Sequence, residues 1–393
     1  MCLLHHIAGA FTQQPESLKD RLGTKAGDLI KRAFDDIDPA RLVDHHTHVA
    51  GVGPDSGAFV NPKMRAWRHP LHHLKFSVYM SAALVNDVRN ADAQILKRLV
   101  RLITNIDGHG KHYLLAFDKN YRRDGTANLE KTEFYVPNDY VFKLAEQHPD
   151  CFEPVISVNP YRSDAIAELE RGAKRGARMV KWLPNAMGID PSDELCDPFY
   201  QKMKALDLVL LSHGGEEKAV EAEEDQRLGN PLLLRRALDH GVRVIVAHCA
   251  GLGDNEDIDD RERERVPNFE LFLRLMDEKR YEGLLFADIS AMTQYNRSGK
   301  PLTTILQRED LHERLVNGSD YPLPAINVLI RTGSLRKQGY ITRDERVWLN
   351  EIYDYNPLLF DFTLKRTLRV PGTERCLPAS IFMTNSALTN RLA

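Results

Sequence analysis

Short, almost continuous apolar runs recur along the chain and alternate with amphipathic stretches. After an amphipathic helical segment at residues 15–38, the apolar runs cover residues 41–50, 112–118, 152–158, 177–183, 208–213, 242–248, 283–290 and 314–320. Apolar runs of this length are typical of parallel strands that are buried on both faces. Between most of them, apolar positions at helical spacing predict helices over residues 91–106, 138–147, 165–175, 199–206, 232–240, 269–279, 303–307 and 325–337.

Eight strands alternating with helices predict an α/β fold, a (β/α)₈ TIM barrel with an N-terminal helical extension and a C-terminal tail. We expect one domain over residues 1–393, with the barrel core at about 41–360. Residues 51–74 are rich in Gly, Pro and His and are expected to form a loop. A doubly wound open sheet is the alternative, but the chain lacks the GxGxxG and Walker A sequences of its nucleotide-binding versions.

Composition narrows the class of function. Lys plus Arg total 53 and Asp plus Glu total 56, so the formal net charge is −3, which argues against nucleic acid as a partner. The sequence shows no secretory signal and no apolar run long enough to span a membrane. Five scattered cysteines are expected to be reduced thiols: Cys2, Cys151, Cys196, Cys249 and Cys376. We therefore expect a cytoplasmic protein that acts on a small molecule, and association into a homo-oligomer stays open.

Side chains that bind metals occur at the ends of several predicted strands. Asp44, His46 and His48 are spaced two residues apart along the first strand. Every second side chain of a strand points the same way, so these three are expected to share one face. Four later strands also end in such residues: Lys181, His213, His248 and Asp320. A barrel brings the C-terminal ends of its strands to one mouth, where barrel enzymes hold their active sites. Because imidazoles and carboxylates bind Zn²⁺, Mn²⁺ or Fe²⁺, the pattern predicts a divalent metal, zinc first.

This donor set has a specific chemical use. A metal lowers the pKa of bound water toward neutrality and makes it a nucleophile. Asp320 is the lone carboxylate among histidines and is expected to take the proton from that water and return it to a leaving group. Lys181 has two interpretations, because a free ammonium would repel the metal. Either CO₂ carbamylates Lys181, which then bridges two metals, or Lys181 pairs with a substrate anion or with Asp44.

These segments together resemble the amidohydrolase superfamily of metal-dependent TIM-barrel enzymes: VDHHTH, LLSHGG, VIVAHCAG and NGSDYPLP, with Lys181. Residues 181–190, 318–322 and 356–360 resemble the amidohydrolase-related (amidohydrolase 2) branch, which includes relatives of aminocarboxymuconate-semialdehyde decarboxylase. The resemblance implies these core ligands: His46, His48, His213 and Asp320. It implies that His248 is a second-metal ligand or a catalytic histidine, and it places Lys181 at the position carbamylated in binuclear members. One or two ions are therefore expected.

The expected activity is hydrolysis of a C–N, ester or lactone bond by metal-activated water. The alternative is a lyase on the same scaffold that decarboxylates or hydrates a carboxylated substrate. The intact HxH favours hydrolysis, because several decarboxylases of this branch carry Glu in place of the first histidine. A barrel that only binds a ligand would have no use for the full donor set. Candidates for substrate binding are Arg65, Tyr161, Arg162, Trp182, Asn185 and Tyr321.

Overall fold

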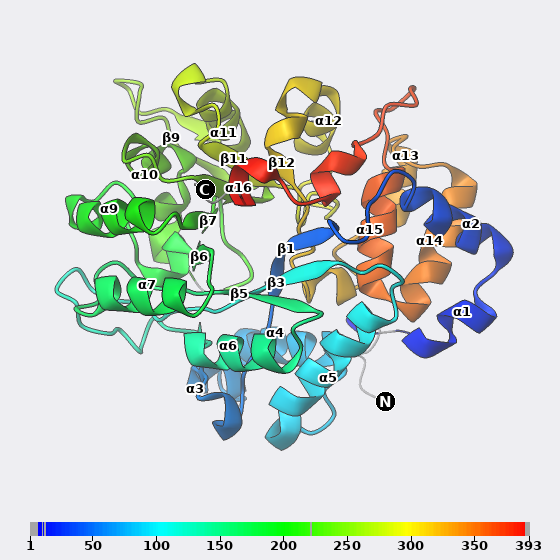
Figure 1. Cartoon of the computed structure of the whole chain (residues 1–393), viewed down its shortest axis with the longest axis horizontal. Coiled ribbons are helices and arrows are strands. Elements are labelled where there is room, and N and C mark those ends of the chain that lie inside the picture. The colour runs from blue at the N-terminus through cyan, green and yellow to red at the C-terminus, as the bar shows by residue number, and fades with distance from the viewer. Residues whose placement is uncertain (1–6, 10, 12, 221, 390–393) are drawn as a thin grey trace.

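The computed structural model describes residues 7–9, 11, 13–220 and 222–389, and its centre is a barrel of parallel strands surrounded by helices (Figure 1). The barrel strands are β1 (Val43–His48), β3 (Lys111–Leu115), β5 (Phe152–Val155), β6 (Met179–Trp182), β7 (Val209–His213), β8 (Val244–Ala247), β11 (Leu285–Asp288) and β12 (Leu315–Val316). They pair in the orders β1-β3-β5 and β6-β7-β8-β11-β12. Parallel bridges from Ile156 to Val180 and from Thr47 to Tyr321 close the two sheets into one eight-stranded barrel. The predicted fold class and its eight strands are confirmed.

Helices cover the outside of the barrel between successive strands and after the last one. They are α5 (Ala91–Thr104), α6 (Asn138–Gln147), α7 (Ala165–Lys174), α9 (Asp197–Ala205), α10 (Arg235–Asp239), α11 (Asn268–Met276), α12 (Lys300–Gln307) and α15 (Pro357–Thr367). Their apolar stripes face the strands, as with Ile95, Leu99 and Leu102 of α5, which are buried at helical spacing. The helix predicted over 325–337 is wrong in its first half, since only α13 (Thr332–Lys337) is helical there.

The strands alternate their side chains between the barrel interior and the surrounding core. Val209 and Leu211 of β7 belong to the interior cluster, whereas Leu210 packs in the larger cluster outside. This period of two decides which residue at a strand end points into the barrel. Leu388 of α16 (Ser386–Thr389) joins the interior cluster. The C-terminal tail therefore forms part of the core.

The segment between β1 and β3 departs from the predicted loop. It contains β2 (Phe59–Val60), which pairs with β4 (Phe134–Tyr135), and the helices α3 (Pro62–Arg65) and α4 (Pro70–Ala82). The loop predicted over 51–74 is thus wrong at α3 and from residue 70 onward. Apolar residues of α4 lie on its exposed side as well as its buried side, so its sequence has no amphipathic spacing by which to recognise a helix.

The helices that precede the barrel pack against helices that follow it. The amphipathic segment at residues 15–38 forms α1 (Leu18–Arg21) and α2 (Thr24–Ala33) rather than one helix, because the backbone is extended at Leu22 and Gly23. α2 packs against α14 (Arg343–Tyr355) and α15. Smaller elements are α8 (Pro184–Met187), β9 (Asp254–Glu256) and β10 (Arg265–Pro267). Within the described ranges, no helix is long and apolar enough to cross a membrane. The four described cysteines are free, and Cys2 lies outside the described residues.

Candidate metal centre

Three metal-binding side chains converge at the mouth of the barrel. The Nε2 atoms of His46 and His48 lie 3.1 Å apart. Oδ1 of Asp320 lies 3.5 Å from Nε2 of His46 and 3.2 Å from Nε2 of His48. Donors at about 2.0 Å from a tetrahedral ion are about 3.3 Å from one another. The three atoms therefore have the separations of ligands to one ion.

Asp288 determines which nitrogen of His46 faces this group. Oδ2 of Asp288 lies 2.8 Å from Nδ1 of His46. Burial opposes ionisation of Asp288, but His46, with help from His248 and Ser290, holds the pKa of this carboxyl well below its usual range. An ionised carboxylate only accepts hydrogen bonds, so Nδ1 donates and Nε2 presents its lone pair to the mouth. Sequence reasoning missed Asp288, which lies two residues before the end of the strand predicted over 283–290 and is the last residue of β11 in the structure.

His248 is oriented by a similar relay. The hydroxyl of Ser290 donates to Asp288 and so accepts from Nδ1 of His248, at 2.7 Å. Nε2 of His248 is left facing Oδ2 of Asp320, at 3.7 Å. Burial lowers the pKa of His248 well below its ordinary value, so the ring is neutral. The backbone at His248 has φ 55°, a strained conformation of the kind that concentrates at functional sites.

His213 supplies an unused donor atom. It continues the inward series of Val209 and Leu211 along β7, and its Nδ1 lies 3.5 Å from Oε2 of Glu217. Its Nε2 is buried and has no hydrogen-bond partner among the described residues. Burial, with Lys181 nearby, lowers the pKa of His213 to about 3. A buried lone pair without a partner is costly, and a metal ion would satisfy it.

Asp320 is the anionic member of this group. Burial alone would raise the pKa of its carboxyl, but the neighbouring imidazoles of His46, His248 and His48 hold that pKa well below the usual range. Asp320 therefore stays ionised beside the imidazole nitrogens. One carboxylate with several imidazoles is a donor set that suits zinc, manganese and iron.

Lys181 lies among the predicted ligands. Its Nζ is 3.2 Å from Nε2 of His46, and its side chain is buried. Burial lowers the pKa of Lys181, although Asp288 and Asp320 partly oppose this. The structure thus brings together all six predicted metal ligands. Whether each of them binds metal stays a prediction.

Asp44 departs from the expected alignment with His46 and His48. The pairing of β1 with β3 shifts register between Asp44 and Thr47, which breaks the simple alternation of side chains. Asp44 instead lies 3.4 Å from Nδ1 of His112 and accepts a hydrogen bond from the backbone of His46. It is therefore not a partner for Lys181.

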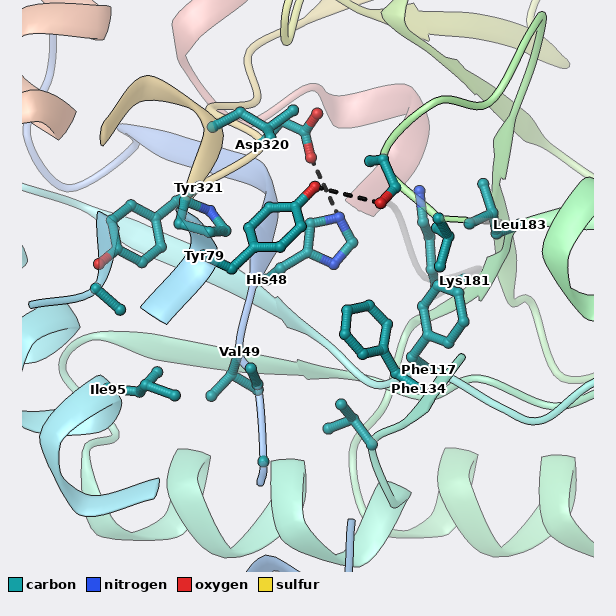
Figure 2. Close-up of a pocket in the computed structure, with 18 of the residues that line it drawn as sticks. His48, Val49, Tyr79, Ile95, Phe117, Phe134, Lys181, Leu183, Asp320 and Tyr321 are labelled. Carbon is teal, nitrogen blue, oxygen red and sulfur yellow. Dashed lines mark hydrogen bonds and ion pairs between the residues drawn. The ribbon is translucent and has the colours of Figure 1, made fainter. Parts of the chain in front are cut away.

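The candidate metal ligands form part of a cavity of about 140 Å³. Figure 2 shows Asp320 and His48 in contact, with the rings of Phe117 and Phe134 on another side of the space. Tyr321 also lines the cavity, as predicted for a substrate-binding residue. Besides the apolar lining residues, sequence reasoning missed two polar ones, Glu217 and Tyr79. Tyr79 lies on α4 in a stretch between the predicted loop at 51–74 and the predicted helix at 91–106, for which no element was predicted.

The other predicted substrate-binding residues do not line the cavity: Arg65, Tyr161, Arg162, Trp182 and Asn185. Trp182 follows Lys181 in β6, so it points the opposite way and packs on Phe199 outside the barrel. The remaining four bind within the protein. The guanidinium of Arg65 and the amide of Asn185 donate to backbone carbonyls, whereas the hydroxyl of Tyr161 and the guanidinium of Arg162 donate to aspartates.

One protein family and several solved structures are similar to this chain. A model of the amidohydrolase family matches residues 116–325, more than half of the chain. No curated protein sequence matches. One similar solved structure is an uncharacterised TIM-barrel protein from Bordetella bronchiseptica, at 16% identity and TM-score 0.47, covering 73% of this chain and 88% of the other.

Two further solved structures are similar in part. A 5-carboxyvanillate decarboxylase from Novosphingobium aromaticivorans with bound manganese has 12% identity and TM-score 0.46, covering 93% of this chain and 98% of its own. A 4-oxalomesaconate hydratase from Rhodopseudomonas palustris has 14% identity and TM-score 0.41, covering 79% and 93%.

Proposed function

The chain belongs to the amidohydrolase family of metal-dependent enzymes, and on that premise we propose that it is a hydrolase of a small molecule. Its substrate would contain a C–N, ester or lactone bond. One observation carries the proposal: the carboxylate of Asp320, which is held ionised, has Oδ1 3.2 Å from Nε2 of His48 and faces the cavity. That group is placed to accept a proton from an attacking water and return it to the leaving group.

The donors at the mouth fit one or two divalent ions, zinc first. We expect the core ligands to be His46, His48, His213 and Asp320, with His248 and Lys181 available to a second ion. When bound, such an ion polarises a carbonyl and lowers the pKa of water. Asp288 and Glu217 hold the imidazoles of His46 and His213 with their Nε2 atoms toward the site, which removes the need to reorganise them during turnover.

We infer that Lys181 is carbamylated. Its Nζ lies beside Nε2 of His46, and no carboxylate in the described part of the chain is within ion-pair distance of it. Attack of the amine on CO₂ forms an N–C bond and releases one proton, which leaves an anionic carbamate. That anion would offset the charge of two cations where a free ammonium would repel them.

A lyase is the second candidate function, and Lys181 is the observation that favours it. It is the one lysine or arginine of the described residues that lines the cavity. As a free ammonium it would hold a substrate carboxylate beside the metal, as decarboxylation requires. In that case Lys181 would bind substrate and would not be carbamylated.

Isotope incorporation distinguishes the two reactions. Metal-loaded protein would be incubated in H₂¹⁸O with a panel of esters, lactones and amides, and separately with aromatic carboxylic acids. Hydrolysis is expected to place one ¹⁸O atom in the acid product of a panel member. The His46→Ala/His48→Ala double variant, which loses two ligands, controls for contaminating hydrolases. The hydrolase proposal would be overturned if only the carboxylic acids reacted, and if they reacted by releasing CO₂ or by adding water without cleavage of a bond.

A further inference from the structure

Away from the metal-binding side chains, the cavity walls are apolar. We propose that the part of the substrate that does not meet the metal is an uncharged apolar body, about the size of one ring. This inference rests on the proposed function for the group that is cleaved. It concerns the walls of the same cavity, which the reaction itself does not specify.

Four segments of the fold supply these walls. α4 contributes Phe76 and Met80, the end of β1 is followed by Val49 and Val52, and α5 contributes Ile95. Phe117, with Phe134 and Val60 of the β2–β4 pair, closes another side (Figure 2). The rings of Phe117 and Phe134 meet edge to face, with centroids 6.2 Å apart. Binding to such a surface is favourable when apolar groups of the ligand cover it and remove it from water.

The charges in the cavity disfavour an anionic body. Of the described lysines and arginines only Lys181 lines it, and Lys181 lies beside His46 at the metal end. The other charged side chain outside the core ligands is Glu217, whose Oε1 accepts from the backbone of Val220 at 3.0 Å. A carboxylate on the substrate body would be desolvated with no cation to pair with, which is costly.

Arg65 on α3 lies near the cavity wall, but its guanidinium is not available to pair with a substrate carboxylate. Nη2 of Arg65 donates to the carbonyl of Val52 at 2.6 Å, and the guanidinium lies over the ring of Phe76. Arg65 therefore supports the wall from behind. The cavity volume of about 140 Å³ is close to the roughly 150 Å³ of an apolar cavity known to hold benzene. One ring with a short substituent fits.

Hydroxamates separate the body from the reacting group, because each compound presents the same chelating group to the metal. Calorimetry on zinc-loaded protein would compare acetohydroxamate, benzohydroxamate and 4-carboxybenzohydroxamate. Benzohydroxamate is expected to bind at least about tenfold more tightly than acetohydroxamate, since its ring is buried. The 4-carboxylate is expected to weaken binding at least about tenfold relative to benzohydroxamate. Equal affinities in either comparison, or tighter binding of the carboxylate, would overturn the proposal.

Adding a cation to the wall should reverse the preference. In Val60→Arg, at a half-buried edge strand, 4-carboxybenzohydroxamate is expected to gain about tenfold in affinity relative to wild type. Val347→Arg, at an exposed apolar position on α14, is the matched control and should change nothing. Phe134→Arg repeats the test if Val60→Arg does not fold. No gain in either folded variant would count against the proposal.

The same data separate this inference from the proposed function. A preference for benzohydroxamate with no hydrolysis of any panel compound would support the apolar substrate body and contradict the hydrolase activity. Some esters carry a carboxylate on their acyl or alcohol part. Hydrolysis of these esters at rates equal to their neutral counterparts would support the hydrolase activity and contradict the apolar substrate body.

Discussion

Two groups of polar and charged side chains lie at different cavities next to β1, and they differ in how their polar atoms are satisfied. In the candidate metal centre, which comprises His46, His48, His213 and Asp320, Nε2 of His46, Nε2 of His48 and Oδ1 of Asp320 lie within 3.5 Å of one another, and Nε2 of His213 has no partner among the described residues. The second group, which we name the paired cluster, consists of Asp44, His112, Asp361 and Lys365. Its carboxylates meet hydrogen-bond donors, and its lysine meets acceptors.

The paired cluster shows what a structural polar network looks like in this fold. Asp361 accepts a hydrogen bond from Lys365, which also donates to the carbonyl of Gly318 at 2.6 Å. Asp44 accepts from the backbone amides of His46 and Ser319, both at 2.9 Å. Burial is similar in the two groups except at His48, which is half-buried. The difference is that Nε2 of His213 in the candidate metal centre meets no donor among the described residues, and a cation bound there would satisfy it.

The largest expected effect is loss of the metal centre's ligands. Wild-type protein is expected to carry about one to two divalent ions per chain. His46→Ala/His48→Ala should remove most of this metal and all turnover, as measured by elemental analysis and product formation. His73→Ala changes an exposed histidine and should leave both unaltered. Wild-type metal content below about a tenth of an ion per chain, after growth with zinc and manganese, would contradict the metal centre.

Breaking the paired cluster should instead cost stability. Lys365→Met leaves the carboxylate of Asp361 buried without its partner, and the free energy of unfolding should fall by about 3–5 kcal/mol. Urea denaturation measures this, with Lys337→Met, at an exposed lysine, as the control. Metal content of the folded variant should not change. A loss of metal without a loss of stability would mean that the two groups are not distinct in role.

The paired cluster should also produce a pH dependence. Burial raises the pKa of Asp361 to about 6 from an ordinary 3.8, against the opposing effect of Lys365. Protonation of Asp361 therefore stabilises the fold fully below about pH 4, and this contribution is lost as the pH rises through 6. The wild-type unfolding free energy minus that of Asp361→Asn should fall by about 2.4 kcal/mol between pH 4 and pH 7. A flat difference would show that Asp361 is not perturbed.

Within the metal centre, Asp320 and the histidines should behave differently. Asp320→Asn keeps an oxygen that can bind metal weakly but removes the proton acceptor. We expect partial metal retention and a decrease in kcat of about 10²-fold or more. Asp107→Asn, at an exposed aspartate, is the control. A kcat within a few-fold of wild type would exclude Asp320 as the base.

The smallest expected effect distinguishes the two roles of Lys181. If Lys181 is carbamylated and bridges two ions, Lys181→Ala should halve the metal content, and short carboxylic acids added with metal should partly restore activity. If it binds a substrate anion, metal content should stay constant and KM should rise. Lys337→Ala is the control. Unchanged metal stoichiometry in Lys181→Ala would lead us to abandon carbamylation.

The barrel and the neighbourhood of its ligands were predictable because both follow local rules. Apolar runs of strand length predicted all eight strands, and polar residues at their ends predicted which side chains would share one mouth. The candidates for substrate binding fared differently. Trp182 is next to Lys181 in sequence but points outward, and Arg65 turns back onto the carbonyl of Val52. Whether a loop or strand-end residue reaches a cavity depends on contacts that are distant in sequence.

The sequence by itself determined the order of strands and helices, and with it the convergence of His46, His48, Lys181, His213, His248 and Asp320. Spacing and polarity along the chain are sufficient for that. Only the tertiary structure decided that Asp288 and Glu217 orient two of these imidazoles, and that Asp44 belongs to the paired cluster. It also decided that α4, a helix without amphipathic spacing, forms a cavity wall. The physical reason is that lone-pair direction and side-chain reach depend on packing between segments, which no local pattern encodes.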